Sequence, residues 1–378
     1  MTMNKVFQEI EDIKNIIFNR EKYKSDIIER YRDSLTSFND LVGENDTEMS
    51  GMFYLVQRHS LYLLKNDKDI SCGKVYLFIR KILYRLILLL GDKLLGCTQV
   101  FENKEDFGVT VTEPKLQSEK PVIYVANHGF RDDVLATVLA AKQHAVTIWG
   151  SLPMFFNTFD GFCSSLIGVV LVNRRHKQSR NAAIDKAVEL LKCGHNILIM
   201  PEGGWNKTSE VLTLPLFGGV YEISKKSGCD VVPIIHYVRD PEIIDKSNKI
   251  YTVVENSVPL YQYEKTKGLS YLRDILSTWQ FLMMEKYGQS TREQELCGFS
   301  SSAEKWHHCV KERMKYVERY DGELERHSDY RSKNIVRPED AFRAIANIKN
   351  INAENIGDVL YAKDLVTQLD QSDFQRLY

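Results

Sequence analysis

Residues 122–133 read Val-Ile-Tyr-Val-Ala-Asn-His-Gly-Phe-Arg-Asp-Asp, and this stretch decides the fold. The apolar, β-branched run Val122–Val125 is typical of a buried strand. A helix-like stretch, Asp132–Gln143, follows it almost at once. The polar residues between them therefore form a strand-to-helix loop. In α/β proteins such a loop lies at the carboxyl edge of the sheet, where functional sites are found.

The same alternation of strand-like and helix-like segments continues toward the C-terminus. Further short apolar runs predict strands at Val169–Val172, Ile197–Met200, Val231–Ile235 and Ile250–Val254, and Ser179–Lys192 is helix-like. Strands that alternate with helices predict an α/β fold with a central, mostly parallel sheet flanked by helices. We assign this α/β domain to residues 100–262.

Helical patterns flank the α/β domain on both sides. Residues 1–70 form a predicted N-terminal helical region, in which apolar residues recur at helical spacing from Val6 to Ile17. Residues 263–378 form a predicted C-terminal helical extension, whose apolar stripe between Leu272 and Met283 is expected to be core.

Residues 71–99 separate these regions and contain an amphipathic helix, KVYLFIRKILYRLILLLGDKLL at 74–95. On a helical wheel its basic residues gather on one side: Lys74, Arg80, Lys81 and Arg85. Its apolar residues fall on the other: Ile79, Ile82, Leu83, Leu86 and Leu90. A helix of this kind lies in a membrane interface or packs against the core of its own domain, and the pattern alone leaves both open.

The bulk composition narrows the class of protein. With 43% hydrophobic and 11% aromatic residues, the 378-residue chain has enough apolar side chains for a core and is not of the disordered class. Its formal net charge of −1 gives no overall attraction to nucleic acid, so no nucleic-acid partner is expected. Seven cysteines without a CxxC pair argue against a disulfide framework and favour a reducing, cytoplasmic compartment. No apolar stretch approaches the roughly 18 residues that a membrane span needs, and the N-terminus does not read as a signal peptide.

The loop after the first strand carries the residues for acid–base chemistry. His128 and Asp133 have His-x4-Asp spacing, and the first helical turn would bring the carboxylate back to the imidazole. A carboxylate on one ring nitrogen fixes the tautomer and leaves the other nitrogen to take a proton from a hydroxyl. The alternative is that Asp132 or Asp133 only caps the helix and His128 is an ordinary loop residue.

Two further sequences follow predicted strands. Pro201-Glu202-Gly203 ends one strand, and its glycines would let the backbone approach a ligand while Glu202 projects at the same edge as His128. Arg174 follows another and would hold a phosphate as a bidentate donor. An exposed turn and a solvated surface arginine are the plain alternatives.

Taken together and in order, these motifs resemble the glycerolipid acyltransferase superfamily, which includes lysophosphatidic acid and glycerol-3-phosphate acyltransferases. Four ordered blocks carry the resemblance over residues 100–260: Asn127-His128-x4-Asp133, Gly168 with Arg174, Pro201-Glu202-Gly203, and Val232-Pro233 with Gly219 upstream. The resemblance implies His128 as general base and Asp133 as its orienting partner. It also implies an acceptor site formed by Asn127, Arg174, Glu202, Gly203 and Lys207.

The resemblance further implies the substrates and surroundings of the site. The acyl donor would be acyl-CoA or acyl-carrier protein, the acceptor a glycerol-phosphate or lysolipid hydroxyl, with no metal, no bound cofactor and no acyl-enzyme intermediate. It favours the interfacial reading of helix 74–95, hence a peripheral protein on the cytosolic face of a membrane. A helix-mediated oligomer is a further expectation.

The third block departs from the family pattern. The family continues Thr-Arg-Ser where this chain has Gly204-Trp205-Asn206, so one arginine expected to contact phosphate is missing. Lys207 would replace it only as a point charge. A hydroxylated lipid without a phosphate, such as a lysoglycolipid, is therefore an alternative acceptor.

Three other classes of function have less support in the sequence. A thioesterase of the serine-hydrolase type is disfavoured because the chain has no Gly-x-Ser-x-Gly. Metal-dependent hydrolysis is disfavoured because the chain has no His-Glu-x-x-His motif. A lipid-binding or scaffold protein on an acyltransferase fold is supported only by the missing arginine.

Overall fold

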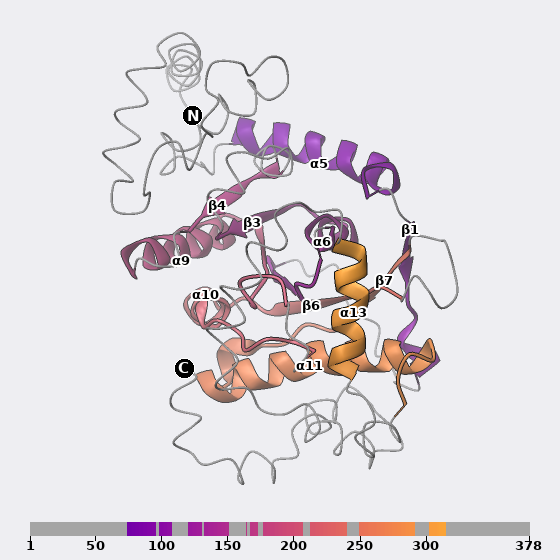
Figure 1. Cartoon of the computed structure of the whole chain (residues 1–378). Helices are drawn as coiled ribbons and strands as arrows, with labels where there is room; N and C mark the ends of the chain where they lie inside the picture. Colours follow the sequence, from indigo (N-terminus) through magenta and orange to yellow (C-terminus); the bar gives the residue numbers. More distant parts are fainter. Residues whose placement is uncertain are drawn as a thin grey trace, which may run out of the picture. The chain divides into compact units, whose positions relative to one another are not determined.

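A computed structural model of the chain describes residues 74–95, 98–107, 120–130, 132–150, 164, 167–172, 177–206, 212–239, 249–291 and 302–314 (Figure 1). The predicted helical region 1–70, Arg174 and Lys207 lie outside these residues. The described residues fall into two compact units. One is formed by residues up to Leu89 with His144–Leu198, and the other by Leu90–Gln143 with residues from Ile199 onward.

The first unit is built on three parallel strands in the order β5-β3-β4. β3 (Ala145–Trp149) pairs on one side with β5 (Asn196–Ile199) and on the other with β4 (Val169–Leu171). Helix α9 (Lys177–Lys192) packs against β4. Directly before β4, Gly168 has a φ of 109°, a backbone conformation that residues other than glycine rarely adopt.

The second unit holds four strands in the order β1-β7-β6-β2. β2 (Ile123–Ala126) pairs in parallel with β6 (Val231–Tyr237), and β1 (Thr98–Phe101) pairs in parallel with β7 (Lys249–Val254). Only the β6–β7 pair is antiparallel among these ladders. The described part of this unit also contains α6 (Asp133–Ala141), α10 (Gly219–Ser227), α11 (Lys265–Lys286), α13 (Ser302–Met314) and the short 3-10 helices η2 (Lys104–Phe107) and η3 (Leu260–Gln262).

Helix α11 belongs to the core of the second unit. It begins after Glu264, whose side chain caps the helix by accepting hydrogen bonds from the backbone N–H groups of Thr266 and Lys267. Its apolar stripe packs against β6 and is buried, with Trp279 fully enclosed. The expectation that the stripe from Leu272 to Met283 is core is therefore confirmed.

The predicted fold class, α/β with a mainly parallel sheet, is confirmed. Each run predicted as a strand contains one, although the bounds differ by a residue or two. β1 and β3 were not predicted. β1 is only four residues long and carries Gln99, while β3 follows the helix α6 after three residues. The predicted domain boundaries at 70, 99 and 262 stay a prediction.

Helix α5 (Lys74–Leu95) has the bounds of the predicted amphipathic segment. Arg80 is only 2% exposed, whereas Lys81 and Arg85 are exposed, so the basic residues do not share one environment. A side chain at Gly168 would lie 3.0 Å from Nη1 of Arg80, so this arginine lies against the start of β4. Among the described residues, no helix combines the length and the apolar character that crossing a bilayer requires.

An ion pair between buried groups ties three elements of the second unit together. Glu255, directly after β7, accepts hydrogen bonds from Nζ of Lys104 at 2.6 Å and from Nε1 of Trp279 at 2.5 Å. The Lys104 and Glu255 side chains are each 6% exposed. The contact joins η2, the end of β7 and α11.

Removing one partner of this buried pair is expected to be costly. We predict that Glu255→Ala lowers the free energy of unfolding by about 3–5 kcal/mol in urea titrations, because it leaves the Lys104 charge buried and unpaired. Glu222→Ala is the matched control, since Glu222 pairs with Lys265 at the surface and its loss should cost less than about 1 kcal/mol. Equal losses for the two variants would contradict the prediction.

Candidate active site

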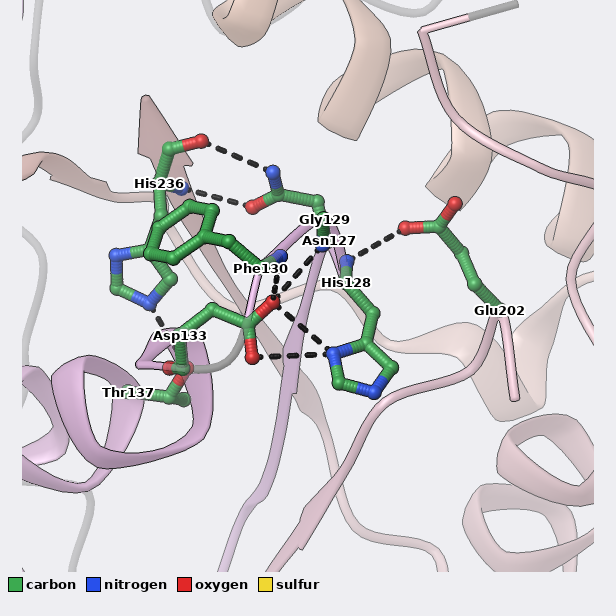
Figure 2. A network of polar contacts seen from close by, with 8 residues as sticks. All are labelled: Asn127, His128, Gly129, Phe130, Asp133, Thr137, Glu202 and His236. Carbon is green, nitrogen blue, oxygen red and sulfur yellow. Dashed lines mark hydrogen bonds and ion pairs between the residues drawn. The ribbon is translucent and has the colours of Figure 1, made fainter. Parts of the chain in front are cut away.

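His128 and Asp133 form a hydrogen-bonded pair at the carboxyl end of β2. The ring nitrogen Nδ1 of His128 lies 3.0 Å from each carboxylate oxygen of Asp133 (Figure 2). Because a carboxylate only accepts, Nδ1 is the protonated nitrogen and Nε2 has the free lone pair. Nε2 points away from Asp133, and no described residue is hydrogen-bonded to it. The His128 side chain is 17% exposed, whereas that of Asp133 is fully buried.

The Asp133 carboxylate is held by the loop that precedes its helix. Its Oδ2 accepts hydrogen bonds from the backbone N–H groups of Gly129 at 2.8 Å and Phe130 at 3.0 Å (Figure 2). The carboxylate thus faces back toward the imidazole. Asp132 occupies the N-cap position of α6, but its side chain makes no capping hydrogen bond. The alternative that Asp132 or Asp133 only caps the helix is therefore wrong, because the Asp133 carboxylate is bonded to His128 and to the preceding loop.

The loop after β5 holds the backbone of His128. Oε1 of Glu202 accepts from the N–H of His128 at 2.7 Å, and the N–H of Asn206 donates to the carbonyl oxygen of His128 at 2.6 Å. Both backbone hydrogen-bonding groups of His128 are therefore engaged by residues 202–206.

Glu202 lies beside His128, as its place after a strand suggests, but it is fully buried. Its second oxygen, Oε2, accepts from the N–H of Leu214 at 2.7 Å. The carboxylate faces protein N–H groups, so a contact of Glu202 with an acceptor stays a prediction. Gly203 is half-buried and has a φ of 70°. Its N–H donates a hydrogen bond to the carbonyl of Met200 at 3.0 Å, which closes a tight turn. Its predicted part in acceptor binding is equally untested.

Asn127 is buried and joins two strands. Its Oδ1 accepts from the N–H of His236 at 2.8 Å, and its Nδ2 donates to the carbonyl of His236 at 2.9 Å (Figure 2). This two-way clamp fixes the end of β2 against β6, one residue before His128. The acceptor-binding role expected of Asn127 stays a prediction.

A chain of buried polar groups lies behind the pair, and no pattern in the sequence predicts it. Nε2 of His236 lies 2.8 Å from Oγ1 of Thr137, which donates to the backbone carbonyl of Asp133 at 2.7 Å. Nδ1 of His236 lies 3.0 Å from Oγ1 of Thr252, which accepts from Nε2 of Gln99. Since the one hydroxyl proton of Thr137 is used on Asp133, His236 carries its proton on Nε2. A lone histidine in an apolar strand is not recognisable as part of a site from sequence.

Trp205, which stands where the resemblance leads to the expectation of an arginine, lies against His128. The ring centroids of Trp205 and His128 are 5.9 Å apart, and the indole is buried. The side chain on this flank of the imidazole is thus apolar and uncharged.

The two other predicted site residues, Arg174 and Lys207, lie outside the described residues. Within the described ranges, no group of three His, Cys, Asp or Glu side chains is placed to hold a metal ion.

Comparisons with known proteins identify a family model and several similar sequences. Residues 108–237 match the family model described as Acyltransferase. The chain is 31% identical over 117 residues to a chloroplastic 1-acyl-sn-glycerol-3-phosphate acyltransferase of Brassica napus, covering 31% of this chain and 33% of that one. It is 24% identical over 128 residues to the 1-acyl-sn-glycerol-3-phosphate acyltransferase of Saccharomyces cerevisiae, covering 34% and 42%. The chain thus spans about a third of the length of the plant relatives it matches.

A solved structure is also similar. It is the 1-acyl-sn-glycerophosphate acyltransferase PlsC of Thermotoga maritima, with a TM-score of 0.43 and 15% identity, covering 63% of this chain and 98% of that one.

The buried histidine behind the pair makes stability depend on pH. Burial lowers the pKa of His236 from 6.5 to about 4, against a smaller opposing effect of the Asp133 carboxylate. The unfolded chain therefore binds a proton there that the folded protein does not. We predict that the free energy of unfolding has its full value above about pH 6.5 and falls on acidification toward pH 4, by on the order of 3 kcal/mol from this residue.

Chemical denaturation at a series of pH values measures this dependence. His236→Gln should flatten it between pH 6.5 and 4. The part due to His144, whose pKa burial also lowers to about 4, should remain. A variant with the slope of the wild type would show that His236 does not titrate as described.

Proposed function

We propose, from the premise that residues 108–237 belong to the glycerolipid acyltransferase superfamily, that this protein is an O-acyltransferase. It transfers a fatty acyl group from acyl-CoA or acyl-carrier protein to a hydroxyl of a glycerol-phosphate or lysolipid acceptor. The observation that carries the proposal is the His128–Asp133 pair, with Nδ1 held by the carboxylate and Nε2 pointing away from it.

In this scheme Nε2 of His128 is the general base. It takes the proton of the acceptor hydroxyl as the oxygen attacks the thioester carbonyl carbon. Asp133 stabilises the imidazolium that forms and prevents the ring from turning. As the carbon–sulfur bond breaks, the imidazolium returns the proton to the departing thiolate. The proton thus passes from the acceptor hydroxyl through His128 to the thiol product, and no acyl-enzyme intermediate is formed.

Glu202 and Asn127 fit this reaction best as positioning residues. Both are buried, and each is hydrogen-bonded to backbone groups of the protein. Glu202 and Asn206 restrain the backbone of His128 from both sides. Holding the base within a fraction of an ångström of its working position is a large part of what an active site contributes to rate.

The acceptor proposed first is a phosphorylated lysolipid. The relatives are named for 1-acyl-sn-glycerol-3-phosphate, and Arg174 would hold its phosphate as a bidentate donor. Lys207 would add a second positive charge.

One observation favours a second candidate acceptor, a lysolipid without a phosphate. The buried indole of Trp205 lies against the His128 ring where the family has an arginine. An apolar side chain at that place offers a phosphate no charge-assisted hydrogen bond.

Helix α5 is proposed as the membrane contact. Its exposed side carries large apolar residues, with Leu89 80% exposed, and two exposed basic residues, Lys81 and Arg85. Apolar side chains that enter the lipid and cations that meet anionic headgroups are the two parts of an interfacial helix. A lipid substrate requires access to such a surface, so we place the protein peripherally on the cytosolic face of a membrane.

The catalytic proposal predicts the effects of two substitutions. His128→Ala should abolish acyl transfer, because no base remains for the hydroxyl proton. Asp133→Asn should lower kcat by about 10²–10⁴-fold, since an amide no longer enforces the tautomer with the proton on Nδ1. The measurement is turnover of radiolabelled acyl-CoA with a lysolipid, with folding checked by circular dichroism.

A buried aspartate elsewhere provides the control. Asp274 in α11 is buried, and burial raises its pKa well above the usual range, which favours the neutral form that asparagine resembles. Asp274→Asn should leave kcat near that of the wild type. Near-normal turnover in folded His128→Ala would end the general-base assignment, and binding of lipid without any transfer by the wild type would favour a scaffold.

A panel of acceptors distinguishes the two candidates. Phosphorylated and neutral lysolipids are offered in the same assay, and the acylated product is identified by mass spectrometry. If Trp205 sets the preference, wild type should favour neutral acceptors, and Trp205→Arg should raise kcat/KM for phosphorylated ones by about tenfold or more. A wild type that prefers phosphorylated acceptors, with no gain in the arginine variant, would select the first candidate.

The membrane contact has a matched test of its own. We predict that Lys81→Glu with Arg85→Glu lowers co-sedimentation with anionic liposomes by about tenfold or more, as each basic residue near such a surface contributes about 1 kcal/mol. Lys177→Glu with Lys192→Glu makes the same charge change on exposed positions of α9 and should have a smaller effect. Equal effects of both double variants would remove α5 from the contact.

A further inference from the structure

Helix α13 packs directly on the loop that joins His128 to Asp133. Residue Trp306, fully buried, has its ring centroid 6.4 Å from that of Phe130 in an edge-to-face arrangement. One turn further along, Val310 is also buried against this loop, with its Cγ2 3.5 Å from the Cβ position of Gly129. The contact is made on the residues whose N–H groups hold the Asp133 carboxylate.

The fit between Gly129 and Trp306 is tight enough to exclude any side chain. A Cβ at Gly129 would lie 2.9 Å from Cζ2 of Trp306, which is closer than carbon atoms approach. The backbone of Gly129 is not in the left-handed region, so alanine is allowed there by conformation. The space taken by Trp306, and not the backbone, therefore requires glycine in this loop.

A charged contact at the end of α13 adds to the packing. The guanidinium of Arg313 lies over the Phe130 ring, 5.1 Å from its centroid, and Nη2 is 3.3 Å from Oδ2 of Asp132. Asp132 is the N-cap residue of α6, whose first residue is Asp133. Arg313 thus bridges the loop and the start of the helix that carries the carboxylate.

The helix has firm support on its other side. Trp306 stacks on Tyr237, the last residue of β6, with ring centroids 5.8 Å apart. The hydroxyl of Ser302 donates to Oγ of Ser290 at 2.8 Å, and Nε2 of Gln289 donates to Sγ of Cys309 at 3.2 Å. α13 is therefore held by contacts to the sheet and to the segment after α11, while its other side packs on the loop that joins His128 to Asp133.

We propose that α13, which follows the residues that match the acyltransferase family, is a positioning element of the active site. Trp306 holds Gly129 and Phe130 in place, these two residues orient Asp133, and Asp133 orients the imidazole of His128. Trp306 touches no reacting atom and acts only through this chain of contacts. The inference rests on the proposed function and extends it to a part of the chain outside the family match.

The test compares two tryptophans in the full-length protein. Trp306→Phe removes the ring atoms that meet Gly129 and keeps an aromatic ring beside Tyr237. Trp279→Phe is the matched control, because Trp279 is equally buried but packs on Phe107 and Glu255. We expect Trp306→Phe to lower kcat about tenfold or more with little change in either KM, as displacement of a base without loss of substrate contacts does. Trp279→Phe should leave kcat within about twofold of the wild type.

A second pair of variants tests the contact itself. Gly129→Ala should lower kcat strongly in the wild-type background, because the new methyl group displaces the loop or Trp306. Gly129→Ala combined with Trp306→Phe should recover activity relative to Gly129→Ala alone, since the clash is gone. Such non-additivity marks a direct interaction between the two positions. Additive losses would overturn the proposal.

A readout without turnover separates this proposal from the proposed function. Backbone hydrogen exchange over residues 127–133, followed by mass spectrometry, should be faster in Trp306→Phe than in Trp279→Phe and the wild type. If the wild type transfers no acyl group, the proposed function fails even where this difference is seen. If the wild type is active but Trp306→Phe matches Trp279→Phe in exchange and in kcat, the positioning role of α13 is refuted.

Discussion

The site depends on one buried carboxylate. Asp133 is fully enclosed, and a carboxylate in such a place is tolerable only when its oxygens are well supplied with donors. Here the donors are Nδ1 of His128 and the N–H groups of Gly129 and Phe130. The need to satisfy this one group therefore shapes the loop and orients the imidazole. The same contact that stabilises the buried Asp133 leaves Nε2 of His128 pointing away from the carboxylate.

Around that carboxylate, separate elements restrain separate parts of the site. The loop 202–206 engages the backbone of His128, and Asn127 clamps the end of β2 to β6. The pair His236 and Thr137 supports the first turn of α6 from behind. The restraints come from segments distant in sequence, so His128 is held by the tertiary fold and not by its own loop alone. Glu202 is buried against the backbone that it holds, and its expected contact with an acceptor stays a prediction.

The limits of prediction have particular physical causes. The buried strands can be recognised from the sequence because short apolar, β-branched runs bounded by polar residues usually form strands. β1 was missed because four residues with Gln99 among them have no such pattern, yet Gln99 is placed by its hydrogen bond to Thr252. The burial of Arg80 could not be foreseen, because a helical wheel sorts side chains by direction and does not show what packs against them. His236 and Trp306 gave no signal, since a buried polar or aromatic residue looks the same in sequence whether it supports a site or only a core.

The sequence by itself determined the class of fold, the order of the motifs and the pairing of His128 with Asp133. These follow from local rules: periodicity fixes the elements, and His-x4-Asp across a strand-to-helix loop brings ring and carboxylate together within one helical turn. Only the tertiary structure decided that Glu202 and Asn127 turn inward, that Trp205 lies against the imidazole and that α13 closes on the loop. Those outcomes depend on contacts between elements that are distant in sequence. Packing between the elements determines these contacts, and the spacing of residues along the chain does not predict them.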